Sequence, residues 1–209
     1  MDFIPALNLN KQINMIQGQY HFTSDSINLA NFVSAKTTDF LIDLGCGSGV
    51  LCLSLSQKLQ RIVACDINED ETKVLMKNIK LNDLKNIEVF TCDANDLHKK
   101  IGANTADVIV CNPPYFSTGK INKNETRAMA RHDNRLTLPN LADISTKLLK
   151  FGGIIYFCYP VNRTAEAITI FENRNFRVKE LKFISNEKGI YLTLFKCKKG
   201  GGHGLKIKT

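Results

Sequence analysis

Short, nearly continuous apolar segments alternate along the chain with longer segments in which apolar residues recur at helical spacing. The apolar segments predict seven β-strands, at residues 40–44, 61–67, 86–92, 106–111, 153–159, 176–184 and 191–198. The helical spacing predicts α-helices at residues 24–35, 49–60, 69–82, 94–101, 139–151 and 163–174. The first five strands are apolar on both faces, which is typical of parallel strands covered by helices on both sides.

This alternation predicts an α/β protein with a Rossmann-like sheet of seven mostly parallel strands and helices on both faces. Only residues 185–190 separate the last two strands, too few for a helical crossover, so these strands are predicted to form a C-terminal antiparallel hairpin. We expect residues 1–199 to form a single domain, with residues 1–38 as a helical and loop extension before the first strand. Residues 200–209 contain four glycines and are predicted to form a flexible basic tail.

The composition excludes several protein classes. The chain has 209 residues, of which 44% are hydrophobic and 23% charged, as in an ordinary globular domain. Its seven cysteines show neither a CxxC spacing nor a zinc pattern with the four histidines, so we expect buried free thiols, no metal site and a cytoplasmic location. We see no signal peptide and no apolar segment long enough to span a bilayer, and therefore expect no membrane partner. No apolar helix face is left over, and we expect a monomer.

The net charge of +8 is concentrated in two segments. Residues 117–135 contain five basic and two acidic residues, and residues 195–209 contain five lysines and no acidic residue. These two segments account for the whole surplus, so a polyanionic partner is one interpretation. A solvated, lysine-rich surface is the other, and charge alone does not decide between them.

A glycine-rich loop follows the first predicted strand, with the sequence Asp43-Leu-Gly45-Cys46-Gly47-Ser-Gly49. Glycine permits a tight turn and lets a ligand lie against the backbone at the start of a helix. A dinucleotide-binding loop would have its third glycine where this chain has Val50. Asp43 beside the loop would repel a pyrophosphate and favour a ligand with an ammonium and a sulfonium group, which points to S-adenosylmethionine.

Two more acidic residues end the next two predicted strands. Asp66, followed by Ile67, lies 21 residues after Gly45, where a carboxylate accepts hydrogen bonds from both hydroxyls of a ribose. Asp93, followed by Ala94, suits the edge of an adenine, because its carboxylate accepts from the amino group while a backbone N–H donates to a ring nitrogen. The alternative is that both acidic residues only cap the helices that follow.

The sequence Asn112-Pro113-Pro114-Tyr115 follows the fourth predicted strand, which lies beside the first in this topology. The amine of adenine is a poor nucleophile because its lone pair is delocalised into the ring. The Asn112 side-chain oxygen and the Pro113 carbonyl are predicted to accept its two hydrogens and localise that lone pair. Proline fixes the backbone, and Tyr115 offers an aromatic face to a flipped base. A proline-stiffened turn without a catalytic role is the alternative.

In these motifs the chain resembles class I S-adenosylmethionine-dependent methyltransferases of the N6-adenine type. It is most similar to the bacterial tRNA(Val) adenine-N6 methyltransferases, which modify the adenosine beside the anticodon. The resemblance covers nearly the whole chain and is carried by residues 20–30, 43–49, 112–116, 127–132 and 198–201. It implies an enzyme that methylates the N6 amine of an adenosine in RNA, at position 37 of a valine tRNA, and leaves S-adenosylhomocysteine.

The resemblance also implies further site residues. Phe22 and Thr23 would help to close the cofactor pocket. The predicted RNA contacts are Phe116, Lys120, Lys123, Arg127, Arg131, His132, Lys198 and Lys199.

Two alternatives stay open at this point. The acceptor is a glutamine amide of a protein in one of them, although the roughly 38 residues before the first strand are too few for the N-terminal helical domain that such enzymes usually carry. The other is a module that binds S-adenosylmethionine or RNA without catalysis, against which the intact motif at residues 112–115 argues.

Overall fold

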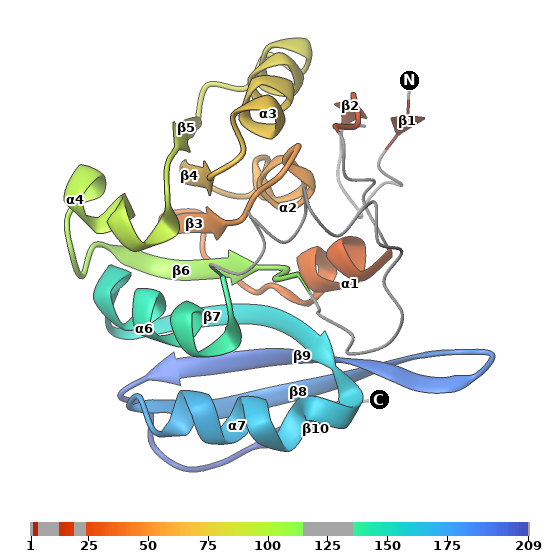
Figure 1. Ribbon diagram of the computed structural model, residues 1–209, viewed down its shortest axis with the longest axis vertical. Helices are drawn as coiled ribbons and strands as arrows, with labels where there is room; N and C mark the ends of the chain where they lie inside the picture. The colour runs from red at the N-terminus through yellow and green to blue at the C-terminus, as the bar shows by residue number, and fades with distance from the viewer. Residues whose placement is uncertain (1, 4–12, 19–23, 115–135, 209) are drawn as a thin grey trace, which may run out of the picture.

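The computed structural model describes residues 2–3, 13–18, 24–114 and 136–208 (Figure 1). The strands of its main sheet are β3 (Phe40–Leu44), β4 (Arg61–Asp66), β5 (Ile87–Thr91), β6 (Ala106–Cys111), β7 (Leu149–Pro160), β8 (Phe176–Asn186), β9 (Gly189–Lys199) and β10 (Lys206–Lys208). They are ordered β10-β8-β9-β7-β6-β3-β4-β5, and β9 is antiparallel to both its neighbours while the other pairs are parallel. A separate antiparallel pair joins β1 (Asp2–Phe3) to β2 (Asn14–Met15). The predicted α/β sheet with a C-terminal hairpin is confirmed.

Helices cover both faces of the main sheet, as predicted (Figure 1). The helices that pack on one face are α1 (Ser24–Phe32), α2 (Val50–Leu55) and α3 (Glu69–Leu81). Those on the other face are α4 (Leu97–Ile101), α6 (Leu138–Leu148) and α7 (Thr164–Glu172). Single 3-10 turns, η1 (Ala94–Asp96) and η2 (Val161–Arg163), precede α4 and α7.

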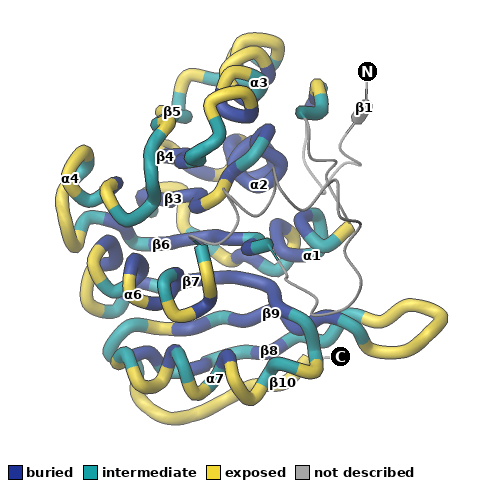
Figure 2. Tube along the Cα trace, in the orientation of Figure 1, coloured by how far each residue is buried: buried dark blue, intermediate teal, exposed yellow. Residues whose placement is uncertain are grey.

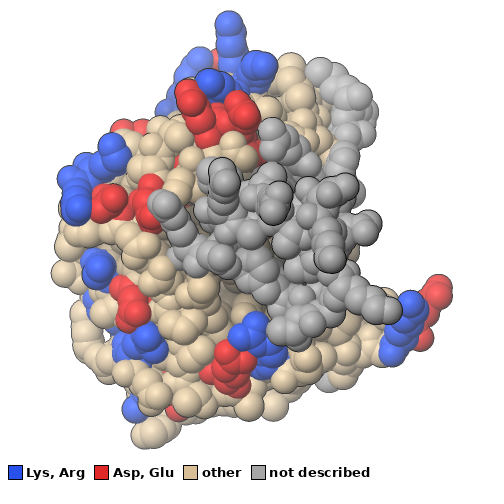
Figure 3. Space-filling model, in the orientation of Figure 1, with Lys and Arg blue, Asp and Glu red and all other residues tan. Residues whose placement is uncertain are grey.

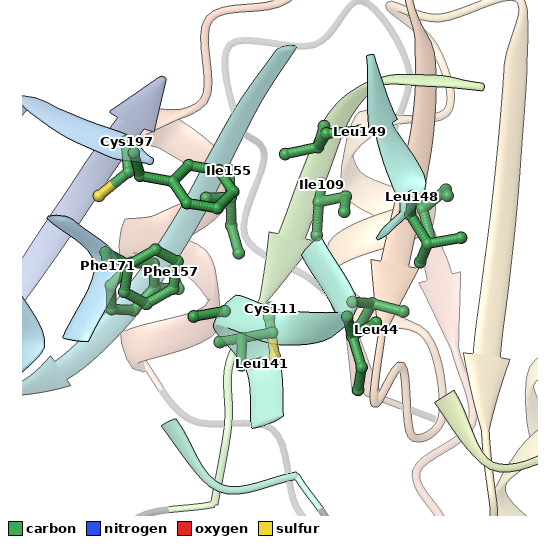
Figure 4. Close-up of a cluster of buried hydrophobic side chains, with 14 of the residues drawn as sticks. Leu44, Ile109, Cys111, Leu141, Leu148, Leu149, Ile155, Phe157, Phe171 and Cys197 are labelled. Atoms are coloured by element: carbon green, nitrogen blue, oxygen red, sulfur yellow. The ribbon is translucent and has the colours of Figure 1, made fainter. Parts of the chain in front are cut away.

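The alternation of side chains along each strand divides the core into two apolar layers. In β3, for example, Leu41 packs against the layer of α1, α2 and α3, whereas Ile42 faces α4, α6 and α7. Figure 2 shows the central strands buried and the hairpin between β8 and β9 exposed. In the second layer Phe157 stacks on Phe171 of α7, with ring centroids 4.5 Å apart (Figure 4). Phe157 also stacks on Phe195 of the neighbouring strand β9, at 4.6 Å. The first of these pairs holds the sheet against α7.

Several predicted boundaries are wrong: the helices expected over residues 24–35 and 49–60 end at Phe32 and Leu55, and a third helix gives way to a strand. The helix expected over residues 139–151 ends at Leu148, and β7 begins at Leu149, which has an extended backbone with φ −74° and ψ 139°. Leu149 pairs with Ala106 at the start of β6. The apolar spacing of the helix continues into this segment, but pairing with a neighbouring strand determines its conformation, and that contact is not visible in the local pattern.

The tail also differs from its prediction. Lys206–Lys208 form β10 and pair with residues 180–182 of β8, so the sheet has eight strands rather than seven. The ammonium group of Lys179 donates to the carbonyl oxygens of Gly202 and His203 at 3.0 and 2.9 Å. These contacts hold a glycine-rich segment whose composition alone indicates flexibility.

Lys199 closes the C-terminus of α6. Its ammonium nitrogen donates to the carbonyl oxygens of Thr146 and Leu149 at 2.6 and 2.7 Å, and to Asn104 Oδ1 at 2.9 Å. The last carbonyls of a helix lack partners within the helix, and a cation there is favourable. Partial burial of this ammonium group lowers the pKa of Lys199.

We expect Lys199→Ala to lower the free energy of unfolding by about 1–3 kcal/mol, because three oxygen acceptors lose a charged donor. The adjacent Lys198 is exposed, and Lys198→Ala should change this free energy by less than about 0.5 kcal/mol. Urea unfolding of the two variants measures the difference. Equal losses in both would contradict the capping role.

Candidate active site

The glycine loop connects the carboxyl end of β3 to α2 (Figure 1). Gly45, Gly47 and Gly49 have φ angles of 69°, 51° and 102°, a region that residues with a side chain rarely adopt. The backbone amides of Gly45 and Cys46 both donate to the carbonyl oxygen of Cys65 in β4, at 2.8 and 3.1 Å. A Cβ atom on Gly49 would lie 2.3 Å from a leucine methyl of α3. Backbone conformation and close packing thus explain why glycine stands at these positions.

Asp43 lies beneath this loop and is fully buried. Its Oδ2 accepts a hydrogen bond from the backbone N–H of Cys52 at 3.0 Å, and so supplies the acceptor that Gly49, the N-cap residue of α2, lacks. Its Oδ1 is buried and has no hydrogen-bond partner among the residues that the structure describes. Burial raises the pKa of Asp43 from 3.8 to about 7, the Cys52 hydrogen bond lowers it, and the charge of Asp66 raises it. A cationic ligand would favour the ionised form.

Asp66 binds the loop from the neighbouring strand. Its Oδ2 accepts from the backbone N–H of Gly47 and its Oδ1 from that of Asn68, both at 2.8 Å. Asn68, and not Asp66, is the N-cap residue of α3. Asp66 therefore does not cap the following helix, and its carboxylate instead ties the turn after β4 to the glycine loop.

Asp93 is the N-cap residue of η1. Its Oδ1 accepts from the backbone N–H and from the side-chain amide of Asn95, both at 2.9 Å. The capping alternative thus describes Asp93 as it stands in this structure, and its contact with an adenine stays a prediction.

Asn112 follows β6, which pairs with β3. In this pairing Val110 of β6 stands opposite Asp43 of β3. The end of β6 and the glycine loop therefore lie at the same edge of the sheet. The side-chain amide nitrogen of Asn112 donates to Ser26 Oγ at 2.9 Å, and its Oδ1 accepts from the Cys158 thiol at 3.1 Å. The predicted catalytic amide thus lies between α1 and β7, next to the predicted cofactor loop.

The carboxyl ends of β3, β4, β5 and β6 form this edge because the four strands are parallel neighbours. The predicted cofactor residues that follow or end these strands are Asp43, Gly45, Cys46, Gly47, Gly49, Asp66, Ile67, Asp93, Ala94 and Asn112. Pro113 is buried and Pro114 partly buried directly after Asn112.

Other predicted site residues are not brought to this edge or are not described. Lys198 and Lys199 end β9, and Lys198 pairs with Ile154 near the amino end of β7, so they lie at the opposite edge of the sheet from Asn112. The ammonium group of Lys199 caps α6, and its contact with RNA stays a prediction. The predicted residues outside the described part are Phe22, Thr23, Tyr115, Phe116, Lys120, Lys123, Arg127, Arg131 and His132.

Two asparagines that the sequence pattern does not identify hold the N-terminal extension, namely Asn78 in α3 and Asn82 at the C-cap of this helix. Asn78 exchanges hydrogen bonds with both backbone groups of Ile16, at 2.7 and 2.9 Å, and Asn82 does the same with Asn14 at 2.9 and 2.7 Å. Asn78 also donates to the carbonyl oxygen of Ser48 in the glycine loop, at 3.0 Å. The signal available in the sequence is a polar residue at the helical spacing of a buried stripe.

The described residues include no helix with the length and apolar character that a membrane span requires. They contain no group of three or more histidine, cysteine, aspartate or glutamate side chains that could hold a metal ion. All seven cysteines of the chain carry free thiols, and six of them are buried, in agreement with the prediction.

Comparison with solved structures shows the class I methyltransferase fold. A predicted O-methyltransferase, protein Atu636 from Agrobacterium tumefaciens, has a TM-score of 0.68 at 16% identity over 88% of this chain and 85% of that chain. The complex of M. jannaschii TYW2 with AdoMet has a TM-score of 0.59 at 18% identity over 86% of this chain and 78% of that chain.

Comparison of sequences shows the family. The family model of the methyltransferase small domain matches residues 22–138. The tRNA1(Val) (adenine(37)-N6)-methyltransferase of Shewanella frigidimarina is 30% identical over 173 residues, 79% of this chain and 69% of that protein. The protein of the same name from Cytophaga hutchinsonii is 31% identical over 157 residues, 73% of this chain and 61% of that protein. With its glycine loop and Asn112 at one sheet edge, the chain belongs to the methyltransferase small domain family, alongside these two relatives.

Proposed function

We propose that this protein is an enzyme that transfers a methyl group from S-adenosylmethionine to the N6 amine of an adenosine in tRNA, and that the adenosine is number 37 of tRNA1(Val), as in the names of its relatives. The observation that carries the proposal is the placement of the Asn112 amide at the end of β6, beside the glycine loop that ends β3. That the chain acts as a monomer in the cytoplasm stays a prediction from the sequence.

The described residues fit this cofactor. Asp43 Oδ1 is a buried acceptor with no partner in the described part of the chain, and an ammonium group is a donor that would satisfy it. When bound, S-adenosylmethionine supplies a methyl group on a positively charged sulfur, which leaves as a neutral thioether. We propose that the Asp66 carboxylate binds the ribose hydroxyls of the cofactor. We assign the edge of its adenine to Asp93 and Ala94. The cofactor would lie against the backbone of Gly45 and Gly47.

Asn112 and Pro113 act on the acceptor amine. The Asn112 Oδ1 and the Pro113 carbonyl oxygen each accept a hydrogen bond from one of the two N6 hydrogens. These hydrogen bonds draw the nitrogen toward a tetrahedral geometry and localise its lone pair. Both acceptors are uncharged and are fixed by strand β6 and by the proline backbone, so that they are in position before the reaction. The nitrogen becomes acidic only after it has gained the methyl group, and its proton then passes to solvent.

The tRNA part of the proposal rests on the relatives and on charge. Figure 3 shows basic and acidic side chains interleaved over the described part of one face, with no continuous basic patch there. Residues 117–135, which follow the catalytic motif in the sequence, have three more basic than acidic residues. This segment is where we place the phosphate contacts, through Arg127 and Arg131.

The test is methylation of tRNA isolated from cells that lack this modification. We expect the wild-type protein with S-adenosylmethionine to produce N6-methyladenosine in valine tRNA, measured by mass spectrometry of digested nucleosides. Asn112→Ala should lower the rate on the order of 100-fold, because one of the two acceptors on the amine is lost.

Asn173→Ala is the matched control, since this asparagine is exposed at the end of α7, away from Asn112, and should leave the rate unchanged. No methylated nucleoside from the wild-type protein would contradict the proposal. Label transferred to protein would instead favour the glutamine alternative, and cofactor binding without any transfer would favour a binding module.

The salt dependence of tRNA binding distinguishes the two basic segments. We expect the affinity for tRNA to fall steeply with salt, because each phosphate contact releases counterions from the RNA. The double variant Arg127→Ala/Arg131→Ala should reduce the slope of log Kd against log salt concentration by about 1–2, because fewer counterions are released when two contacts are missing. Lys198→Ala/Lys206→Ala removes the same charge from the far edge of the sheet and should leave the slope unchanged. Equal effects would mean that the charge acts without a defined site.

Cofactor binding should depend on pH through Asp43. Its carboxyl group has a pKa of about 7 without ligand and is therefore mostly neutral in mild acid, whereas a cationic ligand binds the ionised form better. We expect the affinity for S-adenosylmethionine to rise on the order of tenfold between roughly pH 5.5 and 7.5. Calorimetry at several pH values measures it.

Asp43→Asn provides the control for this prediction. The variant should bind the cofactor more weakly, with an affinity that no longer follows pH in this range. The raised pKa also means that Asp43 contributes stability fully below about pH 3.8, and that this contribution is lost as the pH rises to about 7. The ligand-free variant should not show this loss. An unchanged pH profile of binding would contradict the role of Asp43.

A further inference from the structure

The Asn112 side chain is held by two residues from distant parts of the chain. Ser26 on α1 accepts a hydrogen bond from its amide nitrogen at 2.9 Å, and the Cys158 thiol in β7 donates to its Oδ1 at 3.1 Å. Ser26 is 7% exposed and Cys158 is fully buried. Neither residue belongs to the glycine loop or to the motif at residues 112–115.

Orientation matters because a carboxamide has two different ends. With Oδ1 toward the acceptor amine, Asn112 accepts one of its hydrogens. If the amide were turned by half a rotation, its NH2 group would face the substrate amine, and two donors would oppose each other. An asparagine performs the proposed chemistry only in one of these two orientations.

Of the two partners, Cys158 distinguishes these orientations, since the Ser26 hydroxyl both donates and accepts hydrogen bonds. A thiol proton is donated to an oxygen, whereas the sulfur of Cys158 is only a weak acceptor for an amide N–H, so the orientation with Oδ1 toward β7 is favoured. A carbonyl oxygen has two lone pairs, so an oxygen that accepts from a thiol is also able to accept from a substrate amine. Ser26 accepts one of the two amide hydrogens on the other side and completes the arrangement.

Both partners lie on elements that are themselves fixed. Cys158 pairs with Leu194 within the sheet, so its position follows from the strand register. Helix α1 is tied to the sheet at both ends, where the Tyr191 hydroxyl donates to Asp25 Oδ1 at 2.8 Å and the Tyr156 hydroxyl donates to the carbonyl oxygen of Ser34 at 2.9 Å. A side chain held from rigid elements keeps its geometry better than one held from loops.

We propose that Cys158 and Ser26 are positioning residues that fix the Asn112 carboxamide with Oδ1 presented as the acceptor for the substrate amine. This inference rests on the proposed function for the identity of that amine. It assigns to the thiol of Cys158 the role of a hydrogen-bond donor, and to the N-terminal helix α1 a direct part in ordering the catalytic motif.

The test compares Cys158→Ala, Cys158→Ser and Ser26→Ala in single-turnover methylation of tRNA. We expect Cys158→Ala to lower the rate about tenfold and Ser26→Ala about fivefold, with the KM values for cofactor and tRNA changed less than about twofold, as for the loss of one neutral hydrogen bond. Cys158→Ser keeps a donor and should restore the rate to within about threefold of wild type. A serine variant as slow as the alanine variant would overturn the proposal.

Cys197→Ala is the matched control for lost packing. Cys197 is a fully buried thiol in β9, and its replacement by alanine removes a thiol without touching Asn112 or its two partners. We expect this variant to lose stability as Cys158→Ala does and to keep the wild-type rate. An equal loss of rate in both would show that general packing is responsible, and would refute the positioning role.

A second measurement is independent of methylation. In heteronuclear NMR spectra of the ligand-free protein, the side-chain amide signals of Asn112, identified by their absence in Asn112→Ala, should shift in Cys158→Ala and Ser26→Ala and stay in place in Cys197→Ala. Unchanged signals would overturn the proposal. If the wild-type protein does not methylate tRNA, the proposed function fails while this measurement still decides whether the two residues hold the amide.

Discussion

The pairing of β3 with β6 determines where the proposed catalytic groups lie. The chain winds from β3 outward to β4 and β5, and then returns across β3 to β6 and β7. Because these strands are parallel, the loop after β3 and Asn112 after β6 meet at one edge, at the point where the winding reverses. The pairing is specified by apolar residues buried on both faces, such as Ile42 opposite Ile109. The position of the site thus follows from the topology and not from any single polar contact.

Within this frame, the site keeps polar groups at positions where apolar ones would be more stable. Asp43 stands opposite Val110 in the register of β3 and β6, fully buried, with one oxygen used by the first turn of α2. Burying a carboxylate without a full set of partners costs free energy, which is why the pKa of Asp43 is raised to about 7. A cationic cofactor would offset this cost by pairing with the Asp43 carboxylate. Stability of the ligand-free protein and affinity for the cofactor therefore make opposite demands on Asp43.

The sequence predicted the strands 40–44 and 106–111 with the bounds that the structure has, because buried parallel strands are continuous apolar segments. It could not predict that β7 begins at Leu149 or that Lys206–Lys208 pair with β8, since both depend on a neighbouring strand. The motif residues were found by chemistry and spacing. The partners of Asn112 were not, because Ser26 and Cys158 are 86 and 46 residues away and carry no pattern of their own.

The N-terminal extension is linked to both parts of the proposed site. Residues 13–18 of the extension are held by Asn78, which binds both Ile16 and the glycine loop, and helix α1 of the extension reaches Asn112 through Ser26. One stretch of chain is thereby joined to the loop proposed for the cofactor and to the amide proposed for the substrate. Loss of the contacts at Asn78 would free the loop, and loss of those at Ser26 would free the amide. The order of both motifs thus depends on residues that precede the first strand of the main sheet.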